Sequence, residues 1–138
     1  MARRKSLGFL DVGQGDCFVA DTKSGAIIFD GGSSSEDQVG RYRILPYMKY
    51  LGYQKIQIAV ISHMDIDHYS GIKELLEMGK IKYLGLPEIP KDATMKKIIG
   101  IAKKRGTTIF YLSRGRQITT KDGSLKVLHP QKNSQMEK

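Results

Sequence analysis

The sequence predicts an α/β fold, a layered sandwich in which helices cover a mixed sheet. The order of the elements is the first observation behind this prediction, because short apolar runs with tight turns come first and alternating helical and strand patterns follow. The second is the apolar run at residues 56–62, which is typical of a buried strand with parallel neighbours. The chain has 138 residues and no internal repeat, so we expect one domain over residues 1–138 with a polar tail at 131–138 that frays.

The first third of the chain predicts three short strands, at residues 6–11, 16–21 and 25–30. A hairpin turn should join the second and third, because Thr-Lys-Ser-Gly stands between their apolar runs. Gly-Gln-Gly at residues 13–15 predicts a tight turn rather than a phosphate-binding loop, since no helix N-terminus follows it. Gly-Gly-Ser-Ser-Ser at residues 31–35 then predicts a flexible loop.

Helices and strands alternate in the rest of the chain. A helix should enter near Pro46 and be capped by Gly52, since proline favours the first helical turn and glycine the end of the last. Residues 70–78 show the helical spacing of apolar side chains, and Asp92 should N-cap a further helix. The strands predicted for this part of the chain lie at residues 56–62, 82–86, 107–112, 117–119 and 125–128.

The composition is that of an ordinary globular chain. Hydrophobic residues make up 40% of it, and no apolar run approaches the ~20 residues that a membrane helix needs. The basic N-terminus is followed by no apolar stretch long enough for a signal peptide, so we expect neither feature. The single cysteine, Cys17, excludes an intramolecular disulfide and is expected in a strand as a buried thiol.

The net charge of +9 is unevenly distributed. Residues 1–67 hold eight basic and eight acidic side chains, whereas residues 68–138 hold fifteen basic and six acidic ones. An excess of this size favours a polyanionic partner such as nucleic acid, because Lys and Arg raise the local concentration of phosphate groups. The alternative is that the lysines only solvate an amphipathic helix; the residues in question are Lys96, Lys97, Lys103 and Lys104.

The sequence His-Met-Asp-Ile-Asp-His at residues 63–68 directly follows the apolar run at 56–62. Imidazole and carboxylate groups together favour a divalent metal site, because both offer lone pairs near neutral pH. The carboxyl end of a strand is also where α/β folds place their sites. An EF-hand is excluded, because Leu76 stands at the position of the closing glutamate. Asp67 could also N-cap the following helix, and capping and ligation can coexist.

Four segments, at residues 9–16, 28–32, 39–52 and 62–71, together resemble the metallo-β-lactamase fold superfamily. The resemblance is greatest to its branch of ComEC-type competence proteins, in their C-terminal hydrolase domain. It covers about residues 7–72 and continues weakly to Leu128-His129-Pro130. It implies an αββα sandwich of which this chain holds the N-terminal βα half. The family's later ligand segments, Gly-Asp and His-His-Gly-Ser, are not found after His129, so we expect a domain truncated at its C-terminus.

The resemblance also implies a role for each residue of the motif. His63 would bind a first metal, and Asp67 and His68 a second. Asp65 stands where most members have a second histidine, and its hard oxygen makes Mn or Mg more plausible beside Zn. Asp30 would support the metal loop by hydrogen bonding, as carboxylates behind metal-binding histidines do.

Three further residues are less specific candidates. Asp11 and Asp16 flank the turn at residues 13–15, and we expect them to face the same cleft as supporting carboxylates. His129 lies at a predicted strand end, where a place near the site and a surface or packing role are both open.

The function implied for the parent protein is that of a metal-dependent hydrolase with one or two divalent ions, most plausibly a phosphodiesterase or nuclease acting on DNA in competence; whether this truncated chain is itself active stays open. Asp67 would be the catalytic residue that orients the attacking water. The alternatives are a lactonase- or thioesterase-like hydrolase and a catalytically incomplete DNA-binding module. An uncovered sheet face could also pair two copies of the chain as a homodimer. A ComEC-like parent would place the domain on the extracytoplasmic side of a bacterial membrane, and otherwise we expect it in the cytoplasm.

Overall fold

The computed structural model describes residues 6–15, 17–112, 117–120 and 123–126. The described strands are β1 (Ser6–Phe9), β2 (Phe18–Thr22), β3 (Gly25–Phe29), β4 (Ile56–Val60), β5 (Ile81–Pro87), β6 (Thr108–Leu112), β7 (Gln117–Thr120) and β8 (Gly123–Lys126). The described helices are the π-helix η1 (Gly40–Ile44) and the α-helices α1 (Leu45–Tyr50), α2 (Ile66–Glu77) and α3 (Ala93–Lys104).

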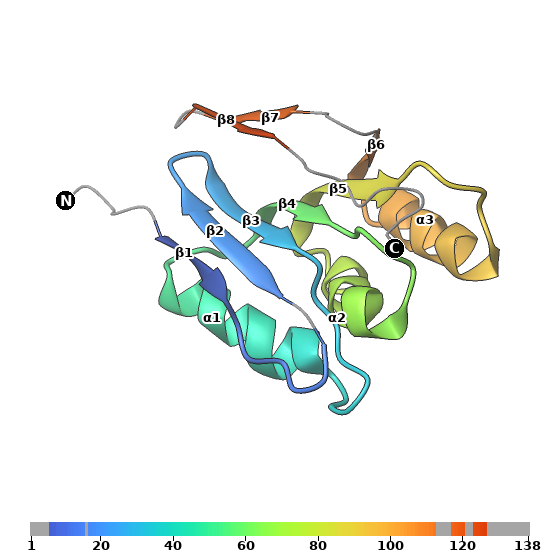
Figure 1. Ribbon diagram of the computed structural model, residues 1–138, viewed down its shortest axis with the longest axis horizontal. Helices are drawn as coiled ribbons and strands as arrows, with labels where there is room; N and C mark the ends of the chain where they lie inside the picture. Colours follow the sequence, from blue (N-terminus) through green and yellow to red (C-terminus); the bar gives the residue numbers. More distant parts are fainter. Residues whose placement is uncertain (1–5, 16, 113–116, 121–122, 127–138) are drawn as a thin grey trace.

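The main sheet has six strands in the order β1-β2-β3-β4-β5-β6, so each strand lies beside its neighbour in the chain (Figure 1). β1, β2 and β3 pair antiparallel, whereas β3, β4, β5 and β6 pair parallel. This is the predicted mixed sheet. Each parallel pair requires a crossover, and helices supply it after β3, β4 and β5. The carboxyl ends of the four parallel strands therefore meet at one edge of the sheet.

The main core lies between the helices and one face of the sheet. Met48 of α1, Leu75 of α2 and Ile98 of α3 are fully buried there. Side chains from one face of the sheet pack in the same core; among these are Ile28, Ala59, Leu84 and Leu86. The alternation follows from the two-residue period of a strand, which sends successive side chains to opposite faces.

A second, smaller cluster occupies the other face of the sheet. Val60 and Leu112 are buried there, and Phe29, Ile58 and Phe110 are half-buried against them. The side chains of β4 thus alternate between two apolar faces, which explains why its sequence is apolar almost throughout. Within the described residues, no helix combines the length and the apolarity that crossing a membrane requires.

Three local predictions are corrected by the structure. Helix α2 begins at Ile66, four residues before the predicted start at residue 70. The N-cap of α2 is Asp65, with extended backbone at φ −102° and ψ 150°, so Asp67 lies in the first turn and is not the cap. The helix near Pro46 is preceded by the π-helical turn η1, which was not predicted, and Gly52, with φ +96°, follows the C-cap Leu51.

Other local predictions are confirmed. Asp92 N-caps α3, since its carboxylate accepts a hydrogen bond of 2.8 Å from the backbone N–H of Met95. Cys17 is a buried thiol as predicted, although it directly precedes β2 and does not lie in the strand. Residues 13–15 form a tight turn, with Gly13 at φ +79° and a bond of 3.0 Å from Gly15 N–H to Gly13 O.

Candidate metal centre

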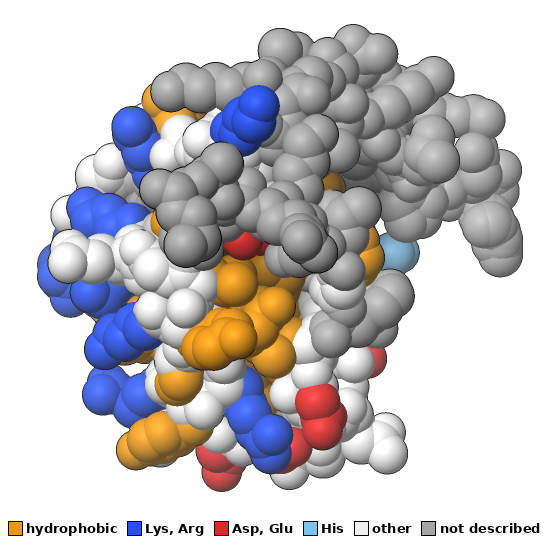
Figure 2. All heavy atoms as spheres, turned by 90° about the vertical axis from the view of Figure 1, so that its left-hand side faces the viewer, with side chains coloured by type: hydrophobic (Ala, Val, Ile, Leu, Met, Phe, Trp, Pro, Cys, Tyr) orange, Lys and Arg blue, Asp and Glu red, His pale blue; other side chains and the backbone are white. Residues whose placement is uncertain are grey.

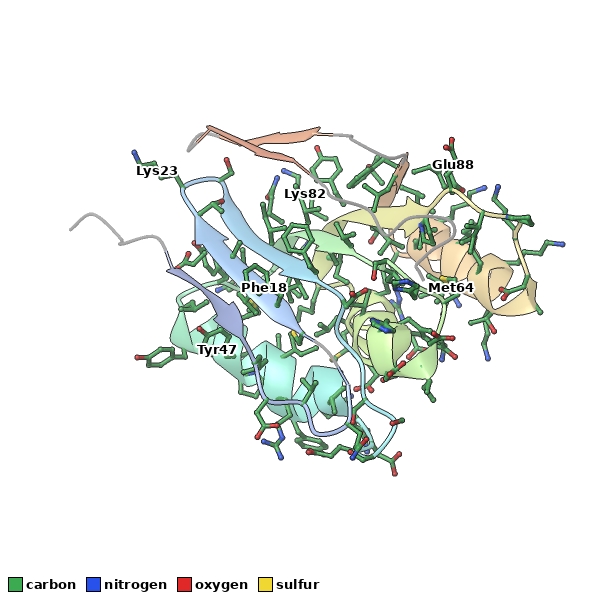
Figure 3. The ribbon with its side chains drawn as sticks, viewed as in Figure 1. Phe18, Lys23, Tyr47, Met64, Lys82 and Glu88 are labelled. Atoms are coloured by element: carbon green, nitrogen blue, oxygen red, sulfur yellow. The ribbon has the colours of Figure 1, made fainter. Side chains whose placement is uncertain are left out.

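The predicted ligands lie at the carboxyl edge of the sheet, where β3 and β4 end side by side. Asp30 directly follows β3, and the loop after β4 carries residues 61–65 into helix α2. Met64, labelled in Figure 3, belongs to this loop and packs against the core. Parallel pairing brings together two segments that lie more than thirty residues apart in the sequence.

Backbone hydrogen bonds fix the end of β3 against strand β4 and helix α2. Asp30 N–H donates to Val60 O at 2.7 Å, and Gly31 N–H donates to His68 O at 2.8 Å. Gly31 O in turn accepts from Ile72 N–H at 2.9 Å. Asp30 has the left-handed φ of +60°, a conformation that Asp tolerates better than most side chains. The chain therefore turns sharply at Asp30, which brings its carboxylate toward the β4 loop.

Gly15 and Gly32 allow three segments of the backbone to pack closely beneath the motif. A Cβ added to Gly32 would collide with Ile66 O and would lie 2.8 Å from Ser70 N. A Cβ added to Gly15 would collide with Gly32 O and would lie 2.9 Å from Asp67 O. The turn at residues 13–15, the loop after β3 and the first turn of α2 are thus in direct backbone contact, and only glycine fits at these two positions.

The carboxylate of Asp30 binds the residues around it through both oxygens. Oδ1 accepts from the backbone N–H of Ser62 at 2.7 Å, and Oδ2 accepts from Ser62 Oγ at the same distance. Oδ2 also lies 3.2 Å from Nδ1 of His68, and both of these side chains are mostly buried. With Nδ1 turned to Asp30, the Nε2 atom of His68 is directed toward Asp67, whose Oδ1 lies 3.8 Å away. The contact with His68 lacks the geometry of a hydrogen bond, so the observed hydrogen bonds of Asp30 go to Ser62, and the supporting role predicted for Asp30 at the metal stays a prediction.

Three of the four predicted ligands converge. One ligand atom each from Asp65, Asp67 and His68 lie within 4.8 Å of one another. His63 lies beside this cluster, with its ring centroid 5.0 Å from that of His68, and its side chain is exposed. Two carboxylates and an imidazole form a donor set that fits a divalent cation, and the two hard oxygens favour Mn or Mg more than an all-nitrogen set would. Asp65, Asp67 and His68 would hold the metal, and a ligand role for His63 stays a prediction.

The less specific candidates have different outcomes. Asp11 is exposed, and its Oδ1 accepts from the N–H of Gly13 at 3.1 Å, so its observed contact closes the turn. A supporting role for Asp11 at the metal stays a prediction. Asp16 and His129 lie outside the described residues. Ser62 was given no role from the sequence, although its position directly before His63 at a strand end was a usable signal.

The chain is similar in sequence to a known protein superfamily. The sequence profile of the Metallo-beta-lactamase superfamily matches residues 10–131, which is most of the chain and contains the whole motif. The chain belongs to this superfamily. Its mixed sheet with helices is consistent with the metallo-β-lactamase fold, as the sequence predicted.

A curated relative extends the comparison. The chain is 29% identical over 140 residues to ComE operon protein 3 of Bacillus subtilis (strain 168). The alignment covers 88% of this chain and 18% of the relative, so the chain spans less than a fifth of that protein. Metallo-β-lactamase superfamily proteins are usually hydrolytic and typically bind divalent metals, and the cluster of Asp65, Asp67 and His68 agrees with both properties.

Proposed function

We propose that this domain is a metal-dependent hydrolase of the phosphodiesterase or nuclease type, acting on DNA. The convergence of Asp65, Asp67 and His68, with Asp30 behind His68, is the observation that carries the proposal. No nucleophilic side chain is needed for this chemistry, because water can serve as the nucleophile at such a site.

Each residue has a distinct part in the proposed reaction. A divalent ion at this site would supply positive charge to a phosphoryl oxygen and would make water a better nucleophile near neutral pH. Asp65, Asp67 and His68 would hold the ion, with His63 beside them. Asp67 has a side chain that is 41% exposed, so it can also accept a hydrogen bond from the attacking water and orient it toward the phosphorus. Asp30 keeps the His68 ring in the orientation that ligation needs.

The choice of DNA rests on the resemblance of four segments to ComEC-type competence proteins and on the net charge of +9. The charge gives less support for binding of a phosphate group at the metal site itself. On the face shown in Figure 2, most Lys and Arg side chains lie along the left-hand edge, whereas the visible histidine lies at the opposite edge. Basic side chains on that face would therefore attract a long polyanion more than they would bind its scissile phosphate.

The test is a substrate comparison with matched variants. We expect the chain, supplied with Mn or Zn, to hydrolyse single-stranded DNA or bis(p-nitrophenyl) phosphate. Asp67→Ala should abolish this activity, and Asp37→Ala, which removes an exposed carboxylate outside the cluster, should not change it. Metal-dependent cleavage of DNA that survives Asp67→Ala would contradict the role given to Asp67, and an absence of any phosphodiesterase activity would contradict the function.

A small-molecule hydrolase on the same fold is the second candidate, and the separation of the described basic side chains from the visible histidine, on the face shown in Figure 2, favours it. Carboxylic esters and thioesters do not need a basic surface. Metal-dependent cleavage of p-nitrophenyl acetate or a lactone, without cleavage of any phosphodiester, would establish this candidate. Binding of single-stranded DNA with a steep salt dependence in the presence of EDTA, without hydrolysis of either class, would instead indicate a binding module.

A further inference from the structure

Ser62 occupies a position between the supporting carboxylate and the most exposed histidine of the motif. We infer that Ser62 is a positioning residue, which transmits the hydrogen-bonding influence of Asp30 to His63 and fixes the tautomer in which His63 can bind metal. This inference rests on the proposed metal site. It adds Ser62 to the residues that prepare the site and connects Asp30 to His63.

The proton positions follow from two short contacts. Ser62 Oγ lies 2.7 Å from Asp30 Oδ2 and 2.9 Å from His63 Nδ1. An ionised carboxylate only accepts hydrogen bonds, and a hydroxyl has one proton to donate. The Ser62 proton therefore faces Asp30, because the opposite arrangement would place two unprotonated oxygens 2.7 Å apart. The Oγ lone pair is then left to accept from His63, so Nδ1 of His63 carries a proton.

The consequence for metal binding lies at the other ring nitrogen. In a neutral imidazole with Nδ1 protonated, Nε2 has the free lone pair that a metal requires. Nδ1 of His68 lies 3.2 Å from the same Asp30 oxygen, but without the geometry of a hydrogen bond, so this contact does not fix the tautomer of His68. Asp30 Oδ2 therefore sets the tautomer of His63, and it does so through Ser62.

The exposure of His63 makes this contact important. A buried histidine is held by its packing, but His63 is exposed, so its ring can rotate freely unless a hydrogen bond holds it. Hydrogen bonds behind metal ligands are worth about 10- to 100-fold in metal affinity. The backbone N–H of Ser62 separately binds Asp30 Oδ1 at 2.7 Å, so removal of the hydroxyl leaves the junction of β3 and β4 in place.

The experiment compares Ser62→Ala with Ser62→Thr in the full chain. The control is Ser24→Ala, which removes a serine hydroxyl in the turn between β2 and β3, at the opposite end of β3 from Asp30. The first readout is the nitrogen-15 NMR spectrum of the histidine rings in metal-free protein at about pH 8.5, where an unperturbed imidazole is neutral. We expect the Nδ1–H form at His63 in the wild-type chain, in Ser62→Thr and in Ser24→Ala. In Ser62→Ala, His63 should shift toward the Nε2–H form while the signals of His68 stay as they are in the wild type.

The second readout is the dissociation constant for Mn²⁺ or Zn²⁺, measured by isothermal titration calorimetry. Ser62→Ala should weaken binding by about 10- to 100-fold, and Ser62→Thr should restore it. An unchanged His63 tautomer in Ser62→Ala would overturn the inference, as would equal metal affinity in Ser62→Ala and the wild type. A wild-type chain that binds no metal would overturn the proposed site, whereas the tautomer readout in metal-free protein would still test Ser62 itself.

Discussion

The substitution Asp30→Asn tests whether the carboxylate organises the site. Asparagine preserves the shape of the side chain and tolerates the left-handed φ of +60° about as well as aspartate, so backbone strain is matched. It cannot preserve the hydrogen bonds. One amide oxygen can still accept from Ser62 N–H, but the NH₂ group then faces Ser62 Oγ and His68 Nδ1, where Asp30 offered an acceptor.

The magnitude follows from the contacts that are lost. The bond from Ser62 Oγ to the carboxylate is lost, and a hydrogen bond to a charged group contributes about 1.5–3 kcal/mol, so we expect a loss of that size in the free energy of unfolding. Metal affinity should fall by at least about 10-fold, because the amide would donate to Ser62 Oγ, whose proton would then face His63 Nδ1 and favour the wrong tautomer of His63. Urea denaturation of Asp30→Asn and of Asp37→Asn, an exposed acidic control, measures the first effect, and calorimetric metal titration measures the second. An unfolding free energy within about 0.5 kcal/mol of the wild type, with unchanged metal affinity, would refute this reasoning.

The remaining predictions concern the backbone junction, a half-buried carboxylate and the ligands. Gly32→Ala should destabilise the chain by more than about 2 kcal/mol in thermal or urea melts, because the added Cβ would meet Ile66 O; Gly100→Ala, with open space in α3, should instead be neutral or stabilise by up to about 1 kcal/mol. Burial raises the pKa of Glu74, so the folded chain binds more protons than the unfolded chain at pH values just above the ordinary pKa of a glutamate. The free energy of unfolding should therefore fall as the pH rises from that ordinary pKa through the raised pKa of Glu74. Glu74→Gln should remove this fall while its amide oxygen still accepts from Arg41 N–H, and an identical pH profile for the two proteins would contradict the assignment. Asp65→Ala should weaken Mn²⁺ binding with little loss of stability, because its exposed side chain makes no N-cap hydrogen bond, and a large drop in melting temperature would show a structural role instead.

Much of the fold was predictable because its strongest signals are local. The apolar run of β4 and the cap at Asp92 mark their elements directly in the sequence. The start of α2 was missed because its first turn faces the site: Asp67 and His68 replace the apolar side chains that reveal a helix elsewhere, and Asp65 caps it without a side-chain hydrogen bond.

The turn η1 was missed for a similar reason. Arg41, Tyr42 and Arg43 are all exposed and give no apolar period. Gly40 is needed there because a Cβ would lie 2.5 Å from Gly71 O, a tertiary contact that the sequence does not show. Tertiary contacts of this kind escape a reading based on periodicity.

The candidate site was predictable in its residues but not in its connections. The motif predicts the ligands, and the resemblance predicts a supporting role for Asp30. The double contact of Asp30 with Ser62, and the contact between Ser62 and His63, depend on the register of β3 against β4 and on the left-handed turn at Asp30. Neither feature is encoded by a local pattern, so the role of Ser62 emerged only from the structure.

Binding of a divalent cation by residues 63–68 can be measured by calorimetric titration of the chain with Mn²⁺, with the double substitution Asp67→Ala and His68→Ala as the comparison. We predict saturable binding of one or two ions by the wild type and a loss of that binding in the double variant, with Asp37→Ala unaffected. Equal Mn²⁺ binding by the wild type and the double variant would contradict this prediction.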